Sequence, residues 1–162
     1  MIRWMGGLLI VASCAAAGVQ GRQMLRRRVR DFMEAEQLTE LIRNHVCGRR
    51  APLPGILKEV ERRFPVRFAG ADDTYQRMNG LSFSEYWRAC LHAGGFDPAA
   101  VGPLAEAVEA IVAGQSPERV LEYCSALLAQ RREDARKQEQ EKGRIYMAFS
   151  TAAGCLITLI LL

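Results

Sequence analysis

Residues 145–162 read IYMAFSTAAGCLITLILL and residues 4–21 read WMGGLLIVASCAAAGVQG, and neither run contains a charged residue. As a helix, each run of 18 residues is roughly 27 Å long, just short of the roughly 30 Å hydrocarbon core of a bilayer. Every acidic residue of the chain lies between the two runs. These features predict one transmembrane helix within residues 1–21, a second over 145–162, and an insert at 22–144.

The inner flank of each run is basic, and this charge predicts the topology. Because positively charged segments stay in the cytoplasm, residues 22–144 should form a cytoplasmic domain with both chain ends on the far side of the membrane. Contact with anionic headgroups and orientation of the chain alone are both open as roles for the basic side chains. The membrane-surface and topology residues are Arg22, Arg26, Arg27, Arg28, Arg30, Lys142 and Arg144.

A second interpretation of the amino-terminal run is a lipoprotein signal. Val11-Ala12-Ser13-Cys14 resembles a lipoprotein processing site, which would make Cys14 a lipidated first residue and export the rest of the chain. A signal peptide of thirteen residues would be unusually short, and the five arginines that follow oppose translocation. The membrane hairpin is therefore the favoured interpretation.

Motifs for catalysis, metal binding and nucleic-acid binding are missing from the sequence. The P-loop, HExxH and GxSxG patterns are absent, and the five cysteines form no CxxC pair. His45 and Cys47, like Cys90 and His92, are two residues apart on predicted helices and so point in different directions. Aromatic residues do not alternate with the basic clusters. We therefore expect a protein that is not an enzyme, uses no cofactor or metal, and does not bind nucleic acid.

Apolar residues recur at steps of three and four through the insert, which predicts helices and no strand. The first membrane helix should continue to about Cys47, because Gly48 follows it as a helix stop. Pro52 should open the next helix and Pro65 should close it. A short helix should lie within 68–80, and later helices should begin at Ser82, Asp97 and Ser116.

The later helix starts carry recognisable caps. Ser82 and Glu85 have the spacing of a capping box, and Asp97 precedes a proline at the first helical position. The expected fold is all-α, with two terminal transmembrane helices flanking a small cytoplasmic helical bundle that acts as a holder and not as a catalyst. The predicted core of the bundle includes Phe83, Trp87, Leu104, Val108 and Leu127.

Six features follow one another along the chain in a distinctive order. They are a basic third residue, two glycines in the first run, an A-P-L turn, an E-Y-W segment and a small-residue motif in the last run. In order, spacing and length these features resemble the stage III sporulation protein AB family, which is similar to reduced F-type platform proteins of type II secretion. The positions concerned are Arg3, Gly6, Gly18, 51–53, 85–87 and 149–154.

The small residues of the two runs predict a face for transmembrane helix packing. The family usually has L-G-x-x-x-G in the last run, and Ser150 replaces the first glycine here while remaining small enough for close approach. Packing of the two spans on each other and packing on a partner protein both stay open. The predicted packing residues are Gly6, Gly18, Ser150 and Gly154.

One stretch departs from the family pattern. The family usually has L-G-x-x-D-x-x-x-Q before its last helix, whereas Pro117 stands here at the acidic position and Leu121 at the glutamine position. The resemblance therefore does not extend to the contact that those polar residues make, although Ser116 and Pro117 keep a helix start.

The resemblance implies a location and partners. Family members sit in the outer forespore membrane, with the helical domain in the mother-cell cytoplasm, as parts of the channel between mother cell and forespore. The implied role is to couple a secretion-type ATPase to the other stage III channel proteins within the lipid bilayer; self-assembly of the chain stays open. Two alternatives are a secretion or pilus platform outside sporulation and a membrane-tethered signalling adaptor.

Overall fold

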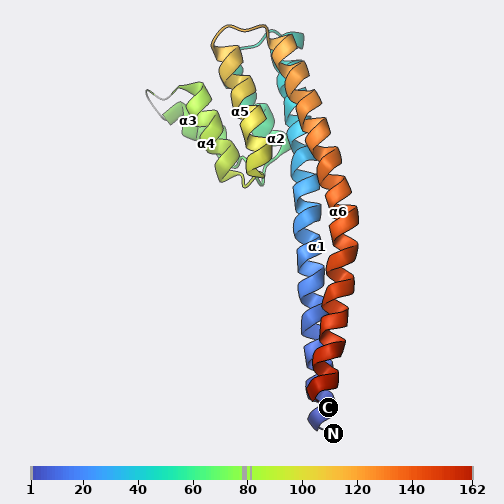
Figure 1. Cartoon of the computed structure of the whole chain (residues 1–162). Coiled ribbons are helices and arrows are strands. Elements are labelled where there is room, and N and C mark those ends of the chain that lie inside the picture. Colours follow the sequence, from blue (N-terminus) through green and yellow to red (C-terminus); the bar gives the residue numbers. More distant parts are fainter. Residues whose placement is uncertain (1, 78–79, 81, 162) are drawn as a thin grey trace. The chain divides into compact units, whose positions relative to one another are not determined.

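The computed structural model describes residues 2–77, 80 and 82–161, and their side-chain surroundings except at 2–11, 15, 147, 154, 155, 158, 160 and 161. All regular structure in the described residues is helical, as predicted (Figure 1). The elements are α1 (Ile2–Arg43), a π-helical turn (Asn44–Gly48), a 3-10 turn (Leu53–Gly55), α2 (Ile56–Arg63), α3 (Ala71–Arg77), α4 (Phe83–Ala93), α5 (Pro98–Val112) and α6 (Pro117–Leu161).

The chain divides into two compact units. The paired-helix unit comprises Met1–Arg30 and Arg132–Leu162, and the bundle unit comprises Asp31–Arg131. Helices α1 and α6 each contribute to both units. The predicted insert at 22–144 therefore contains the whole bundle unit. It also contains parts of α1 and α6 that belong to the paired-helix unit.

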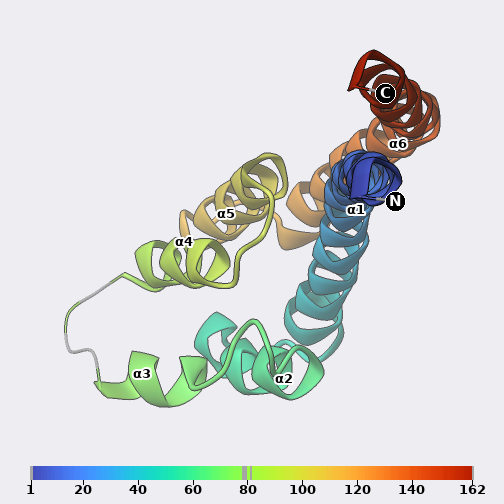
Figure 2. The same cartoon turned by 90° about the horizontal axis from the view of Figure 1, so that it is seen from below.

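In the paired-helix unit, α1 and α6 lie side by side and antiparallel, as Figures 1 and 2 both show. The described residues of the two apolar runs predicted to span a membrane lie inside these helices. Over the residues that the structure describes, no helix has both the length and the apolar character needed to cross a membrane. The two predicted transmembrane helices are therefore not supported by this part of the chain. Residues 4–11 of the first run lie outside the described side chains.

The bundle unit is built around an aromatic cluster. Trp87 is fully buried, and its ring stacks on Phe68 and Phe83 with centroid distances of 5.9 Å and 6.2 Å. The hydroxyl of Tyr86 donates a 2.6 Å hydrogen bond to the carbonyl of Ala71, and burial raises the pKa of this tyrosine. Together these contacts pack α4 against α3 and against the loop that precedes α3.

A proline inside α5 creates the contact that joins α5 to α6. Pro103 has no N–H, so it cannot donate the usual helical hydrogen bond to the carbonyl of Ala99. Arg131 of α6 donates a hydrogen bond to this carbonyl instead. The thiol of Cys124 donates to the Pro103 carbonyl at 3.5 Å, and the Thr39 hydroxyl of α1 lies 3.8 Å from the same sulfur. Three helices therefore meet at one polar junction.

The helix starts agree with the sequence in part. Asp97 caps α5 as expected, since its Oδ1 accepts a 2.9 Å hydrogen bond from the N–H of Ala99. The capping box at Ser82 is wrong: among the described residues this hydroxyl makes no capping bond, because it pairs with the Ser84 hydroxyl at 2.7 Å. The predicted stop at Gly48 and the short helix within 68–80 are confirmed by the end of the π-helical turn and by α3.

Replacement of Trp87 tests the aromatic cluster. Trp87→Ala should lower the free energy of unfolding by about 3–5 kcal/mol, because it leaves a large cavity. Trp87→Phe should cost much less, because it keeps the ring stacking and removes an indole N–H that has no acceptor among the described residues. Urea unfolding of the full chain in detergent, followed by circular dichroism, measures both losses. Equal losses of unfolding free energy in the two variants would contradict the view that ring packing is the contribution of Trp87.

A double-mutant cycle tests the junction at Pro103. Arg131→Ala should cost about 1–3 kcal/mol, because it leaves the Ala99 carbonyl without its donor. In a Pro103→Ala background, the restored backbone N–H can bond this carbonyl, so the cost of the arginine replacement should shrink. Urea unfolding of the four proteins gives the coupling energy. A coupling energy of zero would show that Arg131 does not compensate for the proline.

Candidate functional site

Helices α1 and α6 approach each other closely at Gly18, which is buried. A Cβ atom placed at Gly18 would lie 3.1 Å from the Cβ of Ser150 and 3.3 Å from the carbonyl oxygen of Tyr146. These distances are shorter than ordinary van der Waals contact, so a larger residue would require Ser150 or the backbone of α6 to move by a few tenths of an ångström. The structure thus brings Gly18 and Ser150 together; Gly6 and Gly154 lie outside the described side chains.

A basic collar, defined as residues 22–30 and 132–144, lies next to this contact in the sequence. It carries ten Lys and Arg residues against four Asp and Glu residues, a net charge of +6. The Glu139 carboxylate, 19% exposed, lies 3.6 Å from Arg22 and 3.3 Å from Arg26. Of the predicted topology residues, Arg22 and Arg28 are half-buried; those exposed are Arg26, Arg27, Arg30, Lys142 and Arg144.

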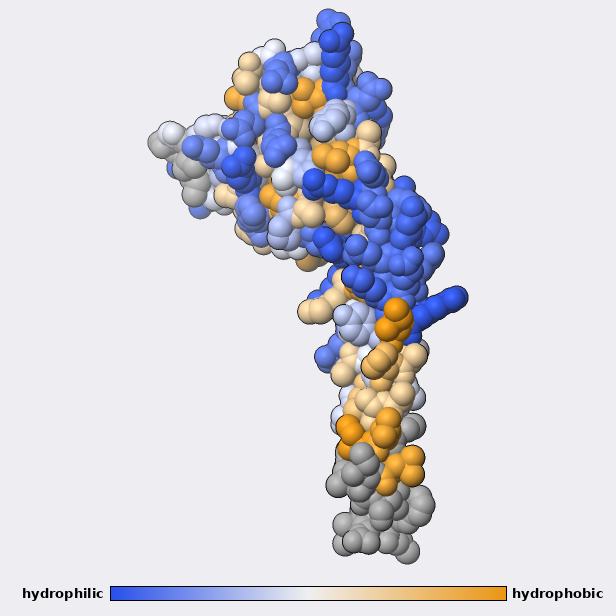
Figure 3. Space-filling view, in the orientation of Figure 1, coloured by the Kyte–Doolittle hydropathy of each residue, from blue (hydrophilic) through white to orange (hydrophobic). Residues whose placement is uncertain are grey.

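An apolar band on α6 begins where the collar ends. Figure 3 shows it as orange atoms that follow the blue atoms of the charged segment. Phe149 and Leu159 are each 77% exposed, which is unusual for large apolar side chains at several successive turns. We define the apolar band by its described, exposed residues, which are Ile145, Tyr146, Phe149, Leu156, Ile157 and Leu159.

The bundle unit carries a groove between α5 and α6 with a volume of about 360 Å³. Tyr123 is 72% exposed on its rim. Pro103 and Leu127 form part of its apolar wall, and Glu106 and Arg119 contribute opposite charges. Leu127, predicted as a core residue, is half-buried in this wall, whereas the other predicted core residues, Phe83, Trp87, Leu104 and Val108, are at most 8% exposed.

Arg67 is a central polar residue of the bundle unit that the sequence did not indicate. Its guanidinium pairs with Asp31, and its Nε lies 2.6 Å from Glu34 Oε2. It also donates a 3.1 Å hydrogen bond to the Gly94 carbonyl and lies 4.2 Å from the centroid of the Phe96 ring. The arginine therefore ties the loops before α3 and after α4 to α1. Only the i, i+3 spacing of the two acids is visible in the sequence.

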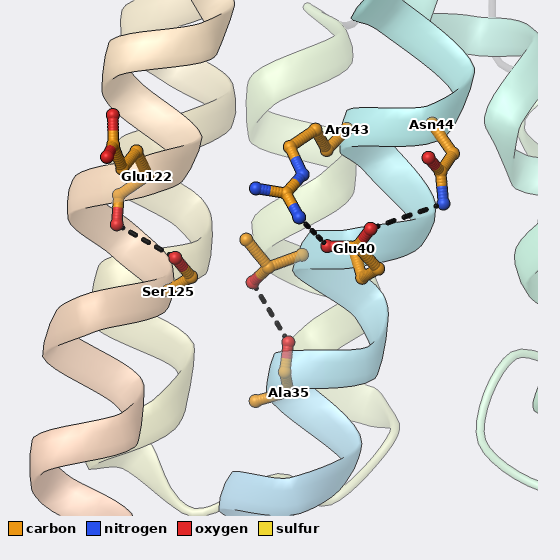
Figure 4. A network of polar contacts seen from close by, with 7 residues as sticks. Ala35, Glu40, Arg43, Asn44, Glu122 and Ser125 are labelled. Carbon is orange, nitrogen blue, oxygen red and sulfur yellow. Dashed lines mark hydrogen bonds and ion pairs between the residues drawn. The ribbon is translucent and has the colours of Figure 1, made fainter. Parts of the chain in front are cut away.

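The end of α1 is held by local polar contacts. Figure 4 shows Glu40 accepting hydrogen bonds from Arg43, the last residue of α1, and from Asn44, the residue after it. His45 Nε2 lies 3.1 Å from the Pro52 carbonyl oxygen, across the turn that follows. The imidazole thus contacts the backbone; no cluster of metal-ligating side chains occurs among the described residues.

Burial raises the pKa of the Cys90 and Cys124 thiols, which keeps them protonated.

A family model for stage III sporulation protein AB matches residues 3–162. The chain belongs to the stage III sporulation protein AB family. No curated protein and no solved structure matches it. This is a structural sporulation family and not a known enzyme family. Membership supports a role in stage III of sporulation, in a membrane-associated complex with other stage III proteins.

The two residues that depart from the stage III sporulation protein AB pattern, Pro117 and Leu121, each suit their position in the structure. Pro117 is the first residue of α6, where a missing N–H costs nothing because the first amides of a helix have no helical acceptor. Leu121 is 1% exposed in the core of the bundle unit. A glutamine at this position would bury an amide that needs hydrogen-bond partners, so leucine suits this core.

Substitution of Gly18 tests the helix contact. Gly18→Ala should destabilise the full chain in detergent by about 1–3 kcal/mol, because the methyl group would overlap α6. Gly102→Ala is the matched control: apart from its neighbours in the chain and the backbone of its own helix, no described atom lies within 4 Å of a Cβ built there, so alanine should stabilise α5 by about 0.5–1 kcal/mol. Thermal unfolding measures both changes. Stabilisation by Gly18→Ala would contradict the close approach.

Proposed function

We propose that this protein is a two-pass membrane platform in the channel complex between mother cell and forespore. In this proposal the paired-helix unit crosses the outer forespore membrane and the bundle unit faces the mother-cell cytoplasm. The observation that carries the proposal is the order of surfaces along α6, where a basic collar is followed directly by an exposed apolar band. The family match over residues 3–162 supports the sporulation setting.

The chemistry of the paired-helix unit favours a lipid environment. Water would solvate the exposed phenyl and leucine side chains of the apolar band poorly, whereas acyl chains would cover them. Tyr146, half-exposed at the collar end of the band, has the amphipathic ring that suits the headgroup region. The collar charge of +6 would stay on the cytoplasmic side.

The bundle unit is the part that would bind a cytoplasmic partner. Residues 31–131 carry eleven basic and fourteen acidic side chains, a net charge of −3, in contrast to the collar. We assign the α5–α6 groove to a secretion-type ATPase, which would place an apolar helix against Tyr123 and a basic side chain near Glu106. The ATP chemistry would belong to that partner, and this protein would position it beside the other channel components.

Deletion of the gene in the native host, with membrane-dye microscopy through spore formation, tests the proposed role. We expect vegetative growth to be normal and development to arrest after engulfment, with small or collapsing forespores, because the channel would lack its platform. Normal spores from the deletion strain, in a host with no second copy of the gene, would contradict this role.

Complementation of the deletion strain adds a test of the groove. A Tyr123→Glu variant should fail to restore spores, because it places a charge on the apolar rim. Val66→Glu is the matched control, since Val66 is 95% exposed elsewhere on the bundle unit. Immunoblots should show equal amounts of both proteins. Restoration of spores by the Tyr123→Glu variant would show that the protein does not need the groove for its function.

A further inference from the structure

The paired-helix unit contains an open cavity with a volume of about 500 Å³ between α1 and α6. This volume lies within the range of roughly 300–1,000 Å³ that is typical of small-molecule sites. Unlike the groove of the bundle unit, the cavity is lined by polar and charged residues over the part of the chain that the structure describes. They are Arg22, Glu139, Gln140, Glu141 and Arg144.

A glycine on α6 lies against the side chain of Arg22, one of the residues that line the cavity. Gly143 is buried, and a Cβ built on it would lie 3.5 Å from Cγ and 3.7 Å from Nε of Arg22. The arginine side chain thus lies along the α6 backbone, where a larger residue at 143 would meet it. The Nε of the same side chain lies 3.6 Å from Glu139 Oε1, and the side chain remains 41% exposed. An arginine held in this way loses little freedom when it binds an anion.

The surrounding charge favours an anionic ligand in spite of the two glutamates. Glu139 is already close to two arginines, Arg22 and Arg26. The collar as a whole carries +6, whereas residues 31–131 carry −3. Arg144 is followed directly by Ile145, the first residue of the apolar band. A ligand with an anionic head and an apolar tail therefore matches this position.

We propose that this cavity binds the phosphate group of an anionic phospholipid. The guanidinium groups of Arg22 and Arg144 would donate charge-assisted hydrogen bonds to the phosphate oxygens, and the Gln140 amide would donate a third. The acyl chains would lie along the apolar band. This inference rests on the proposed membrane insertion. It goes further in that the inserted protein would bind anionic phospholipids in preference to other lipids.

Native mass spectrometry of the full chain in neutral detergent tests the inference, with phosphatidylglycerol, phosphatidylcholine and soluble glycerol phosphate as probes. We expect phosphatidylglycerol to bind about tenfold more tightly than phosphatidylcholine, whose choline group offsets the phosphate charge. Arg22→Gln combined with Arg144→Gln should abolish this preference. Arg27→Gln combined with Lys142→Gln removes the same charge from the collar outside the cavity, and it should keep the preference.

The outcomes show whether the ligand is a lipid or a free phosphate ester, and whether it binds in the cavity. Preference for phosphatidylglycerol with no competition from equimolar glycerol phosphate supports a lipid ligand, and full competition would replace the lipid by a free phosphate ester. Equal loss in both double variants, or no loss in either, would overturn the cavity as a site. Carbonate extraction of the same proteins from cell membranes separates the two proposals. Release of the wild-type chain would contradict membrane insertion. Retention of the wild-type chain and of both double variants would support membrane insertion, whatever the lipid preference of each variant.

Discussion

The close approach of α1 and α6 at Gly18 is the constraint on which the paired-helix unit depends. Only a residue without a Cβ lets the Ser150 side chain lie so near the α1 backbone. This contact fixes the register of two antiparallel helices, and the register decides which collar residues face each other. Glu139 comes to lie between two arginines of α1, and Arg22 crosses over Gly143. A slip of one residue would rotate the charged side chains away from these partners.

Both an apolar core and specific polar contacts stabilise the bundle unit. Apolar burial around Trp87 supplies the main driving force, but it does not specify how loops and helix ends are oriented. Arg67 supplies part of that specificity by joining two loops to the acidic residues of α1. Arg131 supplies another part, because it satisfies the carbonyl that Pro103 leaves without a donor.

The sequence predicted the features that depend on neighbours in the chain. Helix periodicity, the Asp97 cap and the stop at Gly48 are local signals, and the structure contains all three. The Ser82 capping box failed because another hydroxyl two residues away competes for the same bond. Arg67 and its partners could not be predicted, since they lie 36, 33 and 27 residues apart in the chain. Small residues pointed to Gly18 and Ser150, but the cavity at Arg22 required the helix register.

The depth of α6 in a bilayer would show whether the paired-helix unit is inserted in the membrane. Nitroxide labels would be attached one at a time between residues 133 and 159 of a chain whose native cysteines are replaced, reconstituted in lipid bilayers. Collision rates with oxygen and with a water-soluble nickel chelate report the depth of each label. We expect collisions with the chelate to dominate through the collar and collisions with oxygen to dominate from residue 145 onward. Dominance of the chelate along the whole segment would contradict a membrane-inserted helix pair.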